Sequence, residues 1–144
     1  MNKNMSMSSI MDTPKRIQSF FTTKSDENNI VAKFQKDHSF EKRKLESFRI
    51  LEEYPNRVPI ICERVNNDIA ELDRKKYLVP NDLTMCNFMY VIRKRLTVAP
   101  EVAIYLFVNT KIMPTSMTMD SIYHKHKHDD GFLYIYYSGE STFG

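Results

Sequence analysis

Charged and apolar residues alternate along the chain from Ile30 to Tyr54 with few helix breakers. This pattern predicts two helical segments, because Ser39 can cap the second segment and Pro55 ends it. Residues 1–30 are rich in Ser, Thr, Asn, Lys and Met and have no steady apolar period. Such a composition cannot bury enough apolar surface to fold, so we expect a flexible N-terminal extension.

Strand and helix patterns follow in the rest of the chain. The expected strands are Arg57–Arg64, Lys75–Pro80, Ala103–Val108 and Phe132–Tyr137, and the expected helices are Asp82–Leu96 and Met119–His126. This order predicts an α+β fold, a ubiquitin-like β-grasp roll with a four-stranded mixed sheet, a long helix and two preceding N-terminal helices. We therefore expect an extension over residues 1–30, a helical subdomain over 31–56 and the ubiquitin-like domain with its glycine tail over 57–144.

One apolar stripe of the expected N-terminal helix has no evident partner in such a fold. Leu45, Phe48 and Leu51 lie three residues apart and would share one side of the helix. Three large exposed apolar side chains in one patch are unusual on a monomer. We therefore expect the stripe to be covered, either by Phe20 and Phe21 of the extension or by a second copy of the chain.

Composition and charge narrow the class of protein. The chain has 144 residues, enough for one domain with a single core, and its net charge of +3 is too small to make nucleic acid the main partner. No apolar run approaches the ~20 residues of a membrane span, and no signal-peptide pattern follows the N-terminus. Cys62 and Cys86 each lie within an apolar pattern, so we expect two buried thiols in the reducing cytoplasm.

Candidate catalytic chemistry is sparse. His124 and His128 would lie four apart on a helix, but Lys125 and Lys127 repel a cation, so we expect no metal. The cysteines lack a base and an orienting partner, so we expect neither an enzyme nor a cofactor. The small polar tail instead ends on Gly144, and a glycine carboxylate can enter a narrow enzyme channel because no side chain crowds it.

Six segments occur in a recognisable order: Phe40–Arg43, Tyr54–Pro59, Lys76–Pro80, Arg93–Arg95, Leu106–Asn109 and Asp130–Tyr134. Together they resemble the autophagy ubiquitin-like modifiers of the GABARAP and light-chain-3 type. The resemblance implies that Gly144 is joined to phosphatidylethanolamine on autophagic membranes. It also implies as partners the activating, transfer and conjugating enzymes and a deconjugating cysteine protease, which would recognise Thr142 and Phe143. The expected location is the cytoplasm and, after conjugation, the autophagosome membrane.

The resemblance further implies a groove beside the edge strand for cargo receptors and adaptors that carry an aromatic-x-x-aliphatic motif. By matching positions, the first pocket would comprise Glu46, Ile50, Pro59, Ile61, Lys76, Leu78 and Phe132. The second pocket would comprise Tyr77, Val79, Pro80, Leu83, Phe88 and Val91, of which Phe88 is also expected in the core. The expected charges at the rim are Arg57, Lys75 and Arg95.

The family pattern leaves some alternatives open. Most relatives carry residues after the terminal glycine that a protease removes, so the stop at Gly144 reflects either a gene for the mature form or trimming. Two other functions fit the same fold. One is a peptide-binding adaptor that is not conjugated, and the other is a microtubule-associated protein whose Lys42, Arg43 and Lys44 bind an acidic tubulin-like surface.

Overall fold

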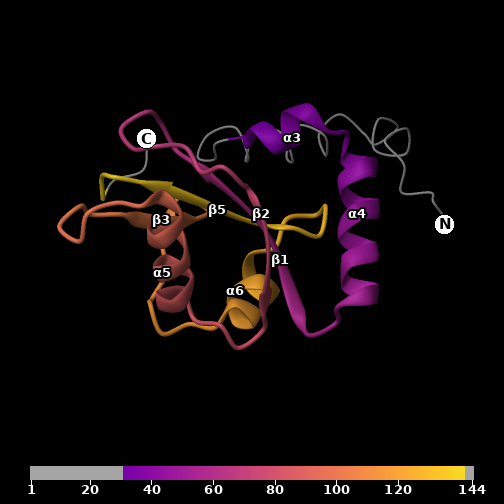
Figure 1. Cartoon of the computed structure of the whole chain (residues 1–144). Helices are drawn as coiled ribbons and strands as arrows, with labels where there is room; N and C mark the ends of the chain where they lie inside the picture. The colour runs from indigo at the N-terminus through magenta and orange to yellow at the C-terminus, as the bar shows by residue number, and fades with distance from the viewer. Residues whose placement is uncertain (1–30, 142–144) are drawn as a thin grey trace.

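Two helices lead into a mixed β-sheet in the computed structural model, which describes residues 31–141 (Figure 1). Helix α3 spans Lys33–Asp37 and helix α4 spans Phe40–Glu53. The break between them falls where the sequence predicts it, because the Ser39 hydroxyl accepts a hydrogen bond from the Lys42 N–H at 3.2 Å. A second expected cap is confirmed at Thr84, whose hydroxyl accepts from Asn87 N–H at 3.1 Å at the start of α5.

The sheet has the order β2-β1-β5-β3-β4. Its strands are β1 (Arg57–Arg64), β2 (Lys76–Pro80), β3 (Tyr105–Val108), β4 (Lys111–Ile112) and β5 (Leu133–Ser138). The central pair β1 and β5 is parallel, and the other pairs are antiparallel. The predicted α+β fold and mixed sheet are confirmed, but the described residues form five strands rather than four. The added strand β4 has only two residues, too few for an alternating pattern to reveal.

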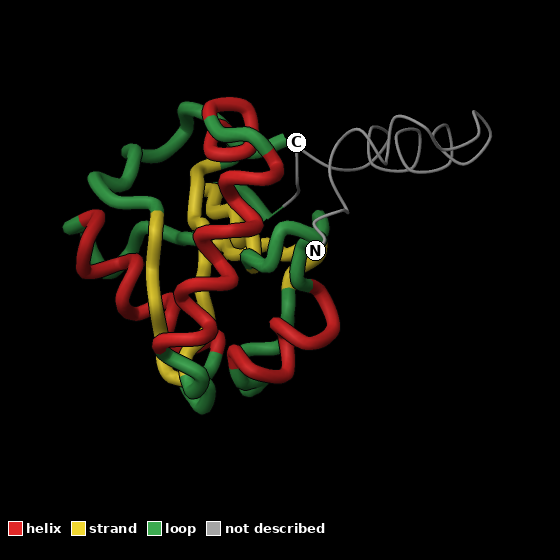
Figure 2. Tube along the Cα trace, turned by 90° about the vertical axis from the view of Figure 1, so that its right-hand side faces the viewer, coloured by secondary structure: helices red, strands yellow, loops and turns green. Residues whose placement is uncertain are grey.

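Helices cover both faces of the sheet, as Figures 1 and 2 show. Helices α5 (Met85–Leu96) and α6 (Met119–His126) pack on one face, where Phe88 and Ile122 join the larger hydrophobic cluster. Phe34 of α3 joins the smaller cluster on the other face, and Ile50 of α4 packs against it. Because both faces are covered, β1 is buried at five consecutive residues rather than at alternate ones. No helix in the described part of the chain has the length and apolarity to cross a membrane.

The two cysteines lie in different environments. Cys62 is buried on β1, and burial raises the pKa of its thiol. Cys86 is exposed in the first turn of α5, so the prediction of two buried thiols is wrong for this residue. The reason is helical spacing, because Met85 and Phe88 take the inward positions of this turn and direct Cys86 to solvent.

Candidate functional site

Strand β2 forms an edge of the sheet, as expected, and among the described residues it pairs only with β1. Lys75, the residue just before β2, directs its backbone carbonyl toward β1, because the Cys62 N–H donates to that carbonyl at 2.8 Å. Backbone groups alternate in direction along a strand, so those of Lys76 and Leu78 point away from β1. This edge therefore presents backbone donors and acceptors to which an extended segment can pair.

The residues expected in the first pocket gather on the face of β2 that carries α4. Lys76 and Leu78 lie on this side of β2, opposite Ile61 and Pro59 of β1. Within the set, Pro59, Ile61 and Phe132 are buried, Glu46, Ile50 and Leu78 are half-buried, and Lys76 is exposed. The arrangement is an apolar floor at the sheet edge whose outer part remains accessible.

The residues expected in the second pocket gather on the opposite face of β2, beside α5. Here Val79 and Phe88 are buried, Tyr77, Leu83 and Val91 are half-buried, and Pro80 is exposed. The Tyr77 ring meets the Phe88 ring edge-on at 5.6 Å between centroids, so Phe88 supports Tyr77 from within the core. Burial raises the pKa of Tyr77 to about 12, which keeps its hydroxyl neutral.

Two residues of the expected first pocket, Lys76 and Glu46, form an ion pair with each other. The Lys76 ammonium is 2.7 Å from the Glu46 carboxylate of α4 and 5.3 Å from the centre of the Phe34 ring. Both partners are partly exposed, so the pair contributes little to stability and can exchange partners. An acidic residue on an incoming segment could therefore take the place of Glu46 at Lys76.

The three charges expected at the rim all have contacts within the chain. Lys75 pairs with Glu63 at 3.3 Å, and Arg95 pairs with Asp73 at 3.1 Å. The Arg57 guanidinium donates to the Leu78 carbonyl at 3.4 Å. A cavity of about 170 Å³ includes Lys75 in its wall but none of the residues expected in the two pockets. The expected pocket residues lie instead along the edge of the sheet, where Lys76 and Pro80 are exposed.

The residues expected at the conjugation site, Thr142, Phe143 and Gly144, lie outside the described residues. They follow β5, which is separated from β2 by β1 in the sheet. The candidate peptide edge and the glycine tail are therefore attached to different strands.

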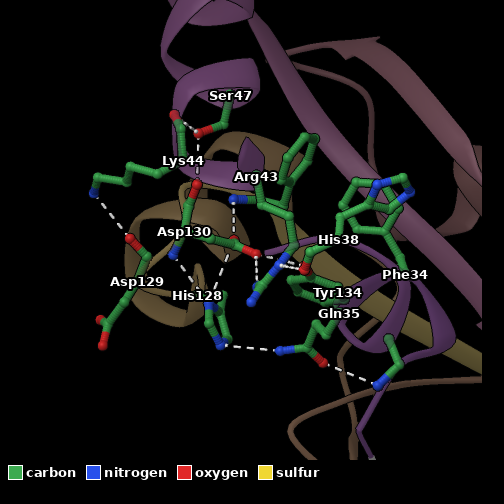
Figure 3. Close-up of polar contacts among 12 residues, drawn as sticks. Phe34, Gln35, His38, Arg43, Lys44, Ser47, His128, Asp129, Asp130 and Tyr134 are labelled. Carbon is green, nitrogen blue, oxygen red and sulfur yellow. Dashed lines mark hydrogen bonds and ion pairs between the residues drawn. The ribbon is translucent and has the colours of Figure 1, made fainter. Parts of the chain in front are cut away.

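Sequence analysis missed a buried polar cluster that joins α4 to the start of β5 (Figure 3). The Arg43 guanidinium lies 2.5 Å from the Asp130 carboxylate, and these residues are 8% and 0% exposed. The same carboxylate accepts hydrogen bonds from the Tyr134 hydroxyl at 2.5 Å and the Phe132 N–H at 2.9 Å. Arg43 also donates to the His38 carbonyl at 3.0 Å, so its charge is well satisfied.

The cluster extends to α3 through His128. The Asp130 N–H donates to His128 Nδ1 at 2.9 Å, and the other ring nitrogen lies 3.1 Å from the Gln35 amide nitrogen. Helix α6 ends at His126, so the expected helical spacing of His124 and His128 is wrong. The described residues contain no group of three His, Cys, Asp or Glu side chains that could hold a metal.

Gly131 allows this turn to pack closely against α4. Its φ is +92°, a conformation that favours glycine, and a Cβ here would clash with the Ser47 hydroxyl. That hydroxyl donates to the Asp130 carbonyl at 2.5 Å. The Asp130-Gly131 pair is itself a turn signal before a strand and could have indicated the position of the turn, though not its partner on α4.

The cluster also corrects the expected basic surface of α4. Arg43 is buried in an ion pair, and the Lys44 ammonium donates to the Asp129 carbonyl at 2.8 Å. Of the three basic residues proposed to meet an acidic surface, Arg43 is therefore unavailable. This finding weakens the microtubule-binding alternative, because that hypothesis needs the three charges together.

We expect acid to weaken the fold through Asp130. Burial disfavours its charge, but the nearby His128 ring and the hydrogen bonds that Tyr134 and Phe132 donate outweigh this and hold the pKa of Asp130 below its ordinary value. A lowered pKa gives stability that is present above the unfolded pKa of about 4 and is lost as pH falls through the folded pKa. Urea unfolding from neutral pH down to about pH 3 should thus show a smaller loss of unfolding free energy in Asp130→Asn than in the wild type.

The neighbouring variant Asp129→Asn is the matched control for this experiment, because Asp129 is exposed. It should lose unfolding free energy with falling pH as the wild type does. If Asp130→Asn and Asp129→Asn follow the same pH dependence, the carboxylate of Asp130 does not carry the effect.

Comparison with known proteins identifies the family. The family model described as "Autophagy protein Atg8 ubiquitin like" matches residues 42–144. Autophagy-related protein 8 of Schizosaccharomyces pombe is 58% identical over 114 residues, covering 78% of this chain and 94% of that protein. Autophagy-related protein 8 of Coccidioides immitis is also 58% identical over 114 residues, covering 78% and 97%.

Solved structures agree with the sequence relatives. The crystal structure of Trypanosoma brucei ATG8 is 47% identical with a TM-score of 0.74, covering 80% of this chain and 100% of that one. Plasmodium falciparum Atg8, solved in complex with a P. falciparum Atg3 peptide, is 32% identical with a TM-score of 0.72 and covers 78% and 99%. The sequence and fold together show that this chain belongs to the Atg8 family of ubiquitin-like autophagy proteins.

Proposed function

We propose that the chain is a modifier that becomes joined, through the carboxylate of Gly144, to phosphatidylethanolamine on autophagic membranes. The observation that carries this proposal is the family match, which runs to Gly144 itself. In this chemistry the carboxylate is activated as an adenylate and passed to an enzyme cysteine as a thioester. The lipid amine then displaces the thiol to form an amide. The chain supplies the acyl group, while other proteins catalyse each step.

The proposed partners follow from this chemistry. They are the activating, transfer and conjugating enzymes of the cascade, together with a cysteine protease that hydrolyses the amide. The relative from Plasmodium falciparum that was solved with an Atg3 peptide supports a partner of the cascade for this chain. The free chain would reside in the cytoplasm and the conjugated chain on the autophagosome membrane.

The test is the mass of the protein recovered from cells in which autophagy has been induced. A fraction of the chain should carry a lipid-sized increment, and fragmentation should place that increment on the C-terminal peptide. Treatment with a phospholipase that removes the phosphatidyl group should reduce the increment. If the chain shows only unmodified mass yet still binds receptor peptides, the adaptor alternative replaces this proposal.

The second part of the proposed function is recognition of receptor peptides at the edge of β2. An aromatic-x-x-aliphatic motif places its two apolar side chains an odd number of residues apart. In an extended strand such residues point to opposite faces. A motif paired with β2 would thus direct one side chain toward Leu78 and Ile50, and the other toward Tyr77 and Val91, which lie half-buried on the two faces of the edge.

Charge would assist this recognition. Acidic residues beside the motif could compete for Lys76 and Arg95, whose present pairs with carboxylates are solvent-exposed at one or both partners, whereas the pair of Lys75 with Glu63 is partly buried on both sides. Exchange of one exposed carboxylate for another changes the free energy little. The charges are therefore expected to raise the association rate and to select acidic motifs, while the apolar contacts supply most of the affinity.

Leu78→Ala should weaken binding of such a peptide by about tenfold, or ~1.4 kcal/mol, because it removes most of a half-buried side chain at the centre of the edge. The measurement is fluorescence anisotropy of a labelled peptide that carries an acidic aromatic-x-x-aliphatic motif. Ile112→Ala is the matched control, since Ile112 is an exposed residue of β4 at the other edge of the sheet. If the two variants bind the peptide with equal affinity, β2 is not the binding site.

A further inference from the structure

The outward side of α4 carries an apolar pair that nothing in the described part of the chain covers. Leu45 is 49% exposed and Phe48 is 59% exposed. The helical period places Glu41 and Glu52, which are also exposed, in line with them. We refer to Glu41, Leu45, Phe48 and Glu52 as the α4 stripe. It is an apolar centre with a carboxylate at each end.

The structure corrects the extent of this patch. Leu51, expected to belong to it, is half-buried and packs against the larger hydrophobic cluster. Ser47 and Ile50 mark the inward side of the helix, since Ser47 is buried and Ile50 packs against the smaller cluster. Figure 1 shows α4 at one side of the molecule, so its outward side faces away from the sheet. The α4 stripe is therefore separate from the surface at the β2 edge.

The geometry points to a specific occupant: Ile17–Phe21 of the same chain docks on the α4 stripe. These residues lie outside the described residues, and they include the apolar side chains of Ile17, Phe20 and Phe21. Lys15 and Arg16 precede this apolar segment, and Lys24 follows it. An apolar centre with a basic group at each end matches the α4 stripe in both polarity and charge.

The length of the connecting chain permits this contact. Ten residues lead from Phe21 to Val31, the first described residue, and can span about 33 Å when extended. A path from Val31 along α3, the two-residue link and α4 as far as Phe48 is about 35 Å, from the rise per residue of helices and extended chain. The straight line between its ends is shorter than this path, because α3 and α4 run in different directions (Figure 1). The segment can thus reach the stripe without displacing any described element.

Covalent attachment also favours this occupant over a second copy of the chain. A segment tethered by a short flexible linker has an effective concentration in the millimolar range. A second copy must supply the same contacts from its free concentration in solution. The docked segment would remove Leu45 and Phe48 from water at both low and high protein concentration, whereas a dimer would form only at high concentration.

The test uses the full chain with Phe48→Trp, because the chain contains no other tryptophan. The emission of this residue should lie at shorter wavelength than that of an exposed tryptophan, and acrylamide should quench it severalfold less. Changing Phe20 and Phe21 to serine in the same chain should restore full exposure. Tyr90→Trp is the matched control, since Tyr90 is 63% exposed on α5, and its emission should not respond to the serine changes.

Three outcomes would overturn the proposal. The first is a Phe48→Trp emission that is equally exposed with and without Phe20 and Phe21. The second is protection that disappears on dilution, which would assign the stripe to a second copy. The third is protection that appears only with phosphatidylethanolamine-containing vesicles, which would assign it to a lipid surface.

Charge reversal provides an independent measurement. Arg16→Glu should increase quenching of the Phe48→Trp residue severalfold, and adding Glu41→Lys or Glu52→Lys should restore at least part of the protection. We expect this rescue because the second change restores an attraction between opposite charges at one end of the docked segment. Failure of both second changes to restore protection would show that the basic ends of the segment do not pair with Glu41 or Glu52.

Discussion

Replacing Gly144 with alanine is expected to abolish the lipid-joined form of the protein. Alanine places a Cβ beside the reacting carboxylate and restricts the backbone at the position that must enter the enzyme channels. The effect should be close to complete, because a chain that fails at the first activation step cannot reach the later ones. The measurement is the loss of the membrane-bound, faster-migrating species in cells with induced autophagy, together with the loss of membrane puncta.

Two variants separate this effect from damage to the fold or to peptide binding. Glu140→Gln changes an exposed residue near the tail and should leave the lipid-joined species at its wild-type level. Leu78→Ala should retain the lipid-joined species as well, because β1 separates β2 from the strand that carries the tail. A normal membrane pool of the Gly144→Ala variant would reject conjugation through this residue.

Replacing Arg43 with methionine should produce the largest loss of stability among single changes in α4. Methionine retains much of the packing volume but leaves the carboxylate of Asp130 buried and without its cation. Breaking a buried ion pair from one side typically costs about 3–5 kcal/mol, which is a large part of the stability of an ordinary domain. Urea unfolding followed by circular dichroism measures this loss directly.

Lys42→Met is the matched control, since Lys42 is an exposed neighbour of Arg43 on the same helix, and it should change the unfolding free energy by less than ~0.5 kcal/mol. The double variant Arg43→Met with Asp130→Asn should be less destabilised than the sum of the single variants, because it leaves no unpaired buried charge. Additive losses would show that the ion pair is not the source of the effect.

The helices and most of the sheet could be predicted because their signals are local. Ser39 and Thr84 cap their helices by hydrogen bonds to residues three positions away, and a three-residue spacing is visible in any sequence. The position of β2 at the edge was also predictable, since the strand is short and the predicted topology places it at the outside of the sheet. Strand β4 was missed because two residues cannot establish a period.

The buried cluster could not be predicted because its signals are not local. Arg43 stands between two lysines and has the charge of a surface residue, yet its partner Asp130 lies 87 residues later. Only the fold brings α4 against the turn before β5. The candidate peptide site was easier to predict than the buried cluster, because the family resemblance supplied the positions of its residues. The structure adds that two of its expected rim cations already have carboxylate partners, which no single position reveals.

The central position of β5 has a consequence for the synthesis of the chain. Leu133–Ser138 forms the last described strand, yet it lies between β1 and β3 and pairs with both. Because chains emerge from the ribosome with the N-terminus first, only the β1–β2 and β3–β4 pairs can form before this strand is available, and nothing yet joins the two pairs. Completion of the sheet therefore depends on residues just before the tail, so a nascent chain truncated before β5 would leave the middle of its sheet unpaired and prone to aggregation.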